Sequence, residues 1–146
     1  MKLNCNTLIM KSILTLFILG AFSLVSSAQC VSGNCFKGHG VFNWDDGSIY
    51  DGAWKDGMQD GNGDFIYENG DRYKGHFSQG KKNGIGTYTW KNGDRYIGGW
   101  KDDKMSGKGK YHWMKDGGTY EGIFSEDAIT NTESQFSVET PEKNSQ

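Results

Sequence analysis

A short pattern of residues recurs along the chain with a nearly fixed period. It consists of tyrosine, then glycine two residues later, then tryptophan or phenylalanine after two more, and its tyrosines are Tyr50, Tyr73, Tyr96 and Tyr120. Their spacings of 23, 23 and 24 residues indicate an array of small supersecondary units, none of which can bury its apolar face alone. The repeat therefore assigns most of the conspicuous residues to a scaffold.

Side chains within each unit alternate with a period of two. Tyr50, Gly52 and Trp54 fall on one face, and mostly polar residues lie between such positions. This alternation is typical of β-strands and places the aromatic residues and glycines together. We therefore predict an all-β fold: an elongated, single-layer antiparallel meander of stacked β-hairpins. Its strands, about eight in number, are expected near 38–44, 48–54, 61–67, 71–77, 84–90, 94–100, 107–113 and 118–124.

Loop lengths predict the register of these strands. A two-residue turn at Asn69-Gly70 would put the aromatic residues of adjacent strands on opposite faces. A three-residue loop that begins at Glu68 instead pairs Phe65 with Tyr73 and keeps the rings together. The last unit has one extra residue, which a four-residue loop absorbs.

This register creates two rows across the sheet, one of aromatic residues and one of glycines. The aromatic row is Phe42, Tyr50, Phe65, Tyr73, Tyr88, Tyr96, Tyr111 and Tyr120, and the glycine row is Gly40, Gly52, Gly63, Gly75, Gly86, Gly98, Gly109 and Gly122. Because glycine weakens a strand on its own, a whole row implies that another group approaches the backbone closely. Neighbouring rings that fold over the glycines are the simplest candidate.

The N-terminal segment 1–28 is predicted to be a secretory signal peptide. Lys2 and Lys11 precede an apolar run, and small residues precede a cleavage point before Gln29. The apolar run is shorter than the roughly 20 residues that span a bilayer. Two alternatives stay open: an uncleaved anchor, and a lipid on Cys30, against which Gln29 argues because lipoprotein signals require a small residue there. We expect export to the periplasm, the cell surface or the extracellular space.

Export also decides how the cysteines are interpreted. In an oxidising compartment, Cys30 and Cys35 are expected to form a disulfide rather than act as nucleophiles or metal ligands. We predict a repeat domain at 29–125 and a flexible acidic tail at 126–146. The repeat domain has 13 basic and 13 acidic residues, so it has no global attraction for nucleic acid or anionic lipid.

The unit, with a second half of the form Gly-x-Gly-x-Tyr/Phe and an Asn-Gly-Asp ending, resembles the MORN (membrane occupation and recognition nexus) repeat. The resemblance comprises a partial repeat at 34–49, full repeats at 50–72, 73–95 and 96–119, and a partial repeat at 120–125. It implies a scaffold or partner-binding module, sometimes dimeric; lipid binding is proposed for the family but is not general. Asp103 stands where the other repeats have Gly57 and Gly80, so this inner turn is expected to differ.

We predict no catalytic, metal or cofactor site. The acidic pairs fall at turns, where aspartate bonds to the backbone. His39, His76 and His112 would lie about 14 Å apart, too far to share one ion. Lys81 and Lys82 are interpreted as part of a solvated turn.

The candidate binding surface consists of aromatic residues: Trp44, Trp54, Tyr67, Trp90, Trp100 and Trp113. These rings either pack onto the next hairpin or form a groove for a peptide, a helix or a sugar. The leading hypothesis is an exported, non-enzymatic scaffold or protein-interaction module of the bacterial envelope, whose partner is another envelope or secreted protein. Binding of glycan, cell wall or a lipid surface is the alternative. A homodimer is a further option, and no nucleic-acid partner is expected.

Mass spectrometry of the mature protein tests the predicted N-terminus. Cleavage after Ala28 should leave Gln29 as the first residue, because Ala28 and Ser26 supply the small side chains that signal peptidase requires. Retention of the apolar segment, or a lipid mass on Cys30, would contradict this prediction.

Overall fold

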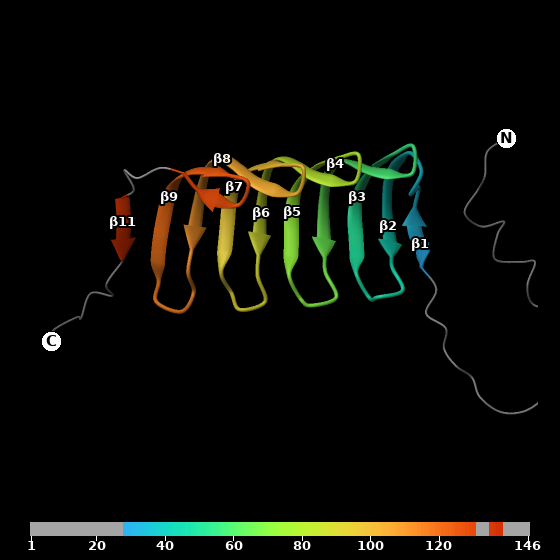
Figure 1. Cartoon of the computed structure of the whole chain (residues 1–146). Coiled ribbons are helices and arrows are strands. Elements are labelled where there is room, and N and C mark those ends of the chain that lie inside the picture. Colours follow the sequence, from blue (N-terminus) through green and yellow to red (C-terminus); the bar gives the residue numbers. More distant parts are fainter. Residues whose placement is uncertain (1–27, 131–134, 139–146) are drawn as a thin grey trace, which may run out of the picture.

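The computed structural model describes residues 28–130 and 135–138, which form one antiparallel sheet (Figure 1). The strands are β1 (Gln29–Gly33), β2 (Gly38–Asn43), β3 (Ile49–Lys55), β4 (Met58–Ile66), β5 (Arg72–Ser78), β6 (Lys81–Thr89), β7 (Arg95–Lys101), β8 (Lys104–His112), β9 (Gly118–Ser125), β10 (Ala128–Ile129) and β11 (Gln135–Val138). Strands β1 to β10 lie in chain order, and β11 pairs with β9. The predicted all-β antiparallel meander is confirmed. Within the described part of the chain, no helix could cross a membrane.

The predicted register is also confirmed. Phe65 faces Tyr73 across the β4–β5 ladder, so both rings lie on one face. The three-residue loop between these strands closes with a 2.9 Å hydrogen bond from the Gly70 N–H to the Tyr67 carbonyl. Gly70 has φ 89°, a left-handed conformation that glycine adopts without strain. Residues 114–117 form the predicted four-residue loop of the last hairpin.

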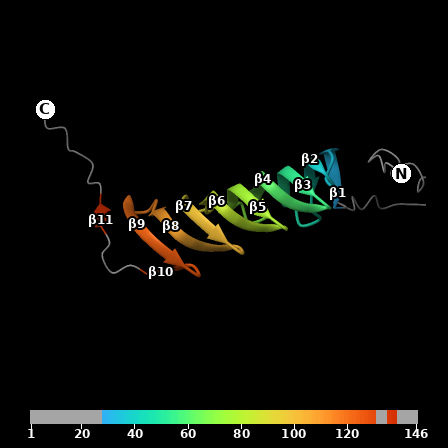
Figure 2. The same cartoon turned by 90° about the horizontal axis from the view of Figure 1, so that it is seen from above.

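A bulge bends each of the long strands. Between the facing glycines and the Trp54–Gln59 pair, β4 has two more residues than β3. Gly61, inside this bulge, has φ 109°, and equivalent irregularities interrupt the β5–β6 and β7–β8 ladders. The bend brings the Trp54 ring to 5.2 Å from the ring of Tyr50, although four residues of a flat strand span about 13 Å. The aromatic face is therefore concave, and the strands curl over along one edge of the elongated array (Figures 1 and 2).

Tyrosine rings cover the bare backbone of the glycine row. Tyr50, Tyr73 and Tyr96 are fully buried, and each lies against a glycine of its own strand and one of the next. A Cβ added to a covered glycine would come closer than 3.0 Å to a tyrosine ring or hydroxyl; this applies to Gly52, Gly63, Gly75, Gly86, Gly98, Gly109 and Gly122. The prediction that rings fold over the glycines is confirmed.

The buried rings connect each repeat to the next. The Tyr73 ring packs edge-on against Phe77 of its own repeat at 5.0 Å and against Trp100 of the following repeat at 5.3 Å. Such aromatic pairs contribute about 0.5–1.5 kcal/mol each beyond the burial of apolar area. The resulting core is Tyr50, Trp54, Tyr73, Phe77, Tyr96, Trp100, Tyr120 and Phe124.

The inner turn of the third repeat does not differ from the others, contrary to expectation. Asp102 and Asp103 have φ values of 46° and 72°, close to the 51° and 79° of Asp56 and Gly57. Aspartate tolerates the left-handed conformation better than most residues. The Asp103 carboxylate also accepts a 2.9 Å hydrogen bond from the Lys82 N–H, which favours this turn.

The sheet extends beyond the predicted strands at both ends. β1 adds a strand before the first expected one, and the segment expected to be a flexible tail from residue 126 contributes β10 and β11. In the β11 register Phe136 faces Tyr120, at the place where the other repeats pair two aromatic residues. Strand pairing therefore continues past Ser125, the predicted end of the repeat domain. Most of the predicted signal peptide and tail residues 131–134 and 139–146 lie outside the described residues.

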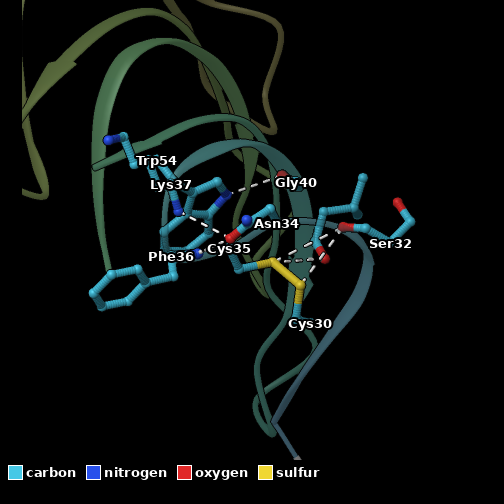
Figure 3. Close-up of a disulfide and its surroundings, with 9 residues drawn as sticks. Cys30, Ser32, Asn34, Cys35, Phe36, Lys37, Gly40 and Trp54 are labelled. Carbon is cyan, nitrogen blue, oxygen red and sulfur yellow. Dashed lines mark hydrogen bonds between the residues drawn. A yellow bond between two sulfur atoms is a disulfide. The ribbon is translucent and has the colours of Figure 1, made fainter. Parts of the chain in front are cut away.

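A disulfide covers the first hairpin (Figure 3). Cys30 and Cys35 are bonded as predicted, with their Cα atoms 6.0 Å apart. A Cβ on Gly40 would lie 2.9 Å from the sulfur of Cys35, so the cysteine occupies the place that a tyrosine has in later repeats. The indole N–H of Trp54, on the neighbouring strand β3, donates a 3.0 Å hydrogen bond to the Gly40 carbonyl of β2.

Substitution of a covered glycine tests the role of these contacts. Gly86→Ala should lower the free energy of unfolding by about 1–3 kcal/mol, because its Cβ would displace the buried Tyr73 ring. Gly117→Asn should be nearly neutral, because no atom lies within 4 Å of the added Cβ and asparagine tolerates φ 72°. Urea denaturation measures both. Equal stability of Gly86→Ala and wild type would contradict the assigned contact.

Candidate functional site

A second line of rings packs beside the core, next to the β2–β3, β4–β5, β6–β7 and β8–β9 loops. These loops lie along the lower edge of the sheet in Figure 1. We call this line of rings the aromatic ribbon: Phe42, Trp44, Phe65, Tyr67, Tyr88, Trp90, Tyr111 and Trp113. Successive ring centroids along it are separated by 4.4 Å (Phe65–Tyr67) to 5.8 Å (Tyr67–Tyr88). All eight side chains are partly buried, so each ring packs on the core and keeps some surface exposed. The ribbon includes the predicted candidates Trp44, Tyr67, Trp90 and Trp113.

Loop aspartates hold the ribbon in place. The Asp71 carboxylate accepts a 2.8 Å hydrogen bond from the Lys91 N–H and a 2.7 Å hydrogen bond from the Tyr88 hydroxyl, both in the next repeat. Asp94 accepts the equivalent bonds from Met114 and Tyr111 at 2.8 and 3.4 Å. The predicted turn role of these aspartates is confirmed. Their links to the next repeat were not predicted, because one repeat viewed alone does not show which loop its neighbour touches.

These contacts also set the charges of the ribbon. Burial would raise the pKa of Asp71, but hydrogen bonds from Tyr88, the Lys91 N–H and Asn69 outweigh it and lower the pKa below its usual value. Burial, and then the Asp71 bond, raises the pKa of the Tyr88 hydroxyl. Burial, with nearby carboxylates, raises the pKa of Tyr67 to about 12. At neutral pH the ribbon therefore presents uncharged rings held by an ionised carboxylate.

Two of the predicted candidates are not on this surface. Trp54 and Trp100 are only 7% and 6% exposed. Their indole N–H groups donate to the carbonyls of Gly40 and Gly86, at 3.0 and 3.3 Å. The prediction that they belong to a binding surface is wrong, because the bend in each strand turns them into the core.

Lys82 lies on the aromatic face rather than in a solvated turn. Its Nζ is 4.5 Å from the Trp100 ring centroid and 4.8 Å from that of Tyr88, and burial lowers its pKa. The earlier interpretation holds for its exposed neighbour Lys81 and is wrong for Lys82. The strand register could have indicated this position, because Lys82 faces Phe77, a residue of the aromatic face.

The opposite face is less suited to recognition. It carries two hollows of about 430 and 520 Å³, lined mostly by glycine backbone and by charged or polar side chains. His39, on this face, pairs with Asp51 at 2.8 Å. Across the described residues, no three histidine, cysteine, aspartate or glutamate side chains are placed to hold a metal ion. The aromatic ribbon is therefore the candidate site.

Comparison with known proteins agrees with this architecture. The family model described as MORN repeat matches residues 36–49, 50–72, 73–95 and 96–117. The last three matched segments each begin at a tyrosine of the repeat: Tyr50, Tyr73 and Tyr96. Comparison with curated proteins gives no match.

The pKa of Asp71 gives a prediction about acid stability. Because its folded pKa is below the unfolded value of about 4, its charge stabilises the protein fully above that pH and progressively less as pH falls through the folded pKa. Asp71→Asn should reduce the free energy of unfolding by about 1–3 kcal/mol at pH 7, and the difference from wild type should shrink towards pH 3. Urea titrations at both pH values measure this.

Asp94→Asn is the matched comparison for this test. Its bond to Tyr111 is longer, at 3.4 Å, so it should cost less than Asp71→Asn. A difference between wild type and Asp71→Asn that stays constant from pH 7 to pH 3 would show that the charge of Asp71 is not the cause.

Proposed function

Because the chain belongs to the MORN repeat family, we propose that it is an exported, non-enzymatic interaction module whose aromatic ribbon binds another envelope or secreted protein. Repeats of this family build modules for protein interaction or membrane binding. We choose a protein partner because eight partly exposed rings form an unbroken line along one edge of the concave face.

The ribbon has the properties of a protein-binding surface. Tryptophan and tyrosine dominate binding energy at interfaces, and rings already held by neighbours lose little conformational entropy on binding. From Trp44 to Trp113 the ribbon crosses three repeats of two strands each, or about 29 Å at a strand spacing of ~4.8 Å. A helix of about 20 residues or an extended segment of about nine has this length.

Export and the lack of an enzymatic role have separate support. Features of a signal peptide precede Gln29, and the Cys30–Cys35 disulfide suits an oxidising compartment. The carboxylates with lowered pKa, Asp71 and Asp94, are engaged in hydrogen bonds between loops, which is a structural rather than a catalytic use.

Affinity capture from envelope extract tests the proposal. Wild-type protein and a Trp90→Ala/Trp113→Ala variant are compared for the proteins they retain, and the affinity of the main partner is then measured with purified components. Loss of one interface tryptophan that contributes about 2 kcal/mol weakens binding about 30-fold, so the double variant should bind at least that much more weakly.

The matched control is Phe36→Ala, which removes a ring that is 64% exposed and lies outside the ribbon. It should bind like wild type. Circular dichroism at the assay temperature confirms that each variant is folded. Equal retention by wild type and the double variant would count against the ribbon, as would binding to glycan or to lipid vesicles with no protein partner.

A further inference from the structure

The ammonium group of Lys82 lies near rings of both the core and the aromatic ribbon. Its Nζ lies 4.5 Å from the ring centroid of Trp100 in the core. It is also 4.8 and 6.0 Å from the ring centroids of Tyr88 and Tyr67 in the aromatic ribbon. The side chain is partly buried, so the ammonium has lost part of its water.

This ammonium has no ion-pair partner among residues 28–130. No carboxylate in that range lies within 4.0 Å of Lys82 Nζ, whereas the neighbouring Lys81 pairs with Asp102 at 3.6 Å. No side-chain hydrogen bond within the same range uses the three donors of Lys82 Nζ either. An ammonium on an aromatic surface with unused donors is able to accept a carboxylate from a partner.

The carboxylates around Lys82 are engaged elsewhere. Those of Asp103, Asp127 and Asp71 oppose the lowering of its pKa by burial. Each of them also accepts a backbone N–H: Asp103 from Lys82 itself, Asp127 from Met105, and Asp71 from the following loop. They lie near the lysine without forming an ion pair with it.

The fold does not need a lysine at this position. Gln59 and Met105 occupy the equivalent places in the flanking repeats, facing Trp54 and Trp100 as Lys82 faces Phe77. An uncharged side chain is sufficient for packing there. The partly desolvated charge in the middle repeat therefore calls for another role.

We propose that Lys82 is the specificity-determining residue of the aromatic ribbon. It selects a protein segment that places an aspartate or glutamate carboxylate against the ammonium while its apolar side chains rest on the rings. A segment without that carboxylate would bury the ammonium unpaired, which disfavours it. This inference rests on the proposed function, since it names the chemistry of the partner at the same surface.

Peptide display tests the proposal without a known partner. A library of random 12-residue peptides is panned on purified wild-type protein, Lys82→Met, Lys82→Arg and Lys81→Met. Methionine is the residue that the chain itself has at the equivalent position 105, so Lys82→Met should fold. Peptides selected by wild type and by Lys82→Arg should share an acidic residue beside apolar ones, and those selected by Lys82→Met should not. Lys81→Met, which removes the adjacent exposed charge, should select like wild type.

A double-mutant cycle then separates charge from fold. The best wild-type peptide should bind Lys82→Met at least about tenfold more weakly, whereas the same peptide with its acid changed to glutamine should bind both proteins equally. Peptides that need the ribbon tryptophans but show no acidic preference would overturn this inference and leave the proposed function standing. Failure to enrich any peptide would overturn both. Lys82-dependent binding of phosphatidylglycerol vesicles without an acidic peptide would overturn the assignment of a protein segment.

Discussion

The rings of Tyr50, Tyr73 and Tyr96 each lie on glycine backbone from two neighbouring strands, and each hydroxyl reaches across the bend of its own strand. Tyr50 donates to the Ala53 carbonyl at 3.0 Å, and Tyr73 and Tyr96 make the same bond to residues 76 and 99 at 3.1 Å. The ring can lie there only because the glycines have no Cβ. Glycine, which weakens a flat strand, is here the condition for a curved one that buries its rings in a single layer.

Because Tyr50, Tyr73 and Tyr96 each pack on a core ring of the next repeat, no hairpin completes its own core. Tyr73 needs Trp100, and the loop carboxylate of Asp71 needs the loop that follows it. An array coupled in this way has incomplete repeats at both ends, which must be covered. The Cys30–Cys35 disulfide covers Gly40 at the first hairpin, and β10 with β11 pairs the outer edge of β9. These two ends differ in sequence from the repeat because they replace a missing neighbour.

The sequence predicted the features that depend on the alternation of side chains along a strand and on the length of the repeat. The pairing of Phe65 with Tyr73 and the common face of the rings followed from loop length alone, because a one-residue shift would have reversed every side chain. The bend was not predicted, since it depends on bulge residues that share the glycine-rich pattern. Trp54 and Trp100 were therefore placed on the surface, although the bend buries them. β11 was missed because its segment lacks the glycines of the repeat, and Lys82 because adjacent lysines usually indicate a solvated turn.

The candidate site follows from what the scaffold leaves unused. The tyrosine rings of the repeat are buried in the core, and the carboxylates of Asp71 and Asp94 form hydrogen bonds between loops. Partly exposed ring surface remains along the ribbon, with one ammonium from Lys82 beside it. Ring surface supplies affinity with little selectivity, because any apolar side chain can rest on it. A single partly desolvated charge supplies selectivity with little area, because it penalises every segment that cannot pair with it. The two together are what a repeat module needs to bind one partner rather than many.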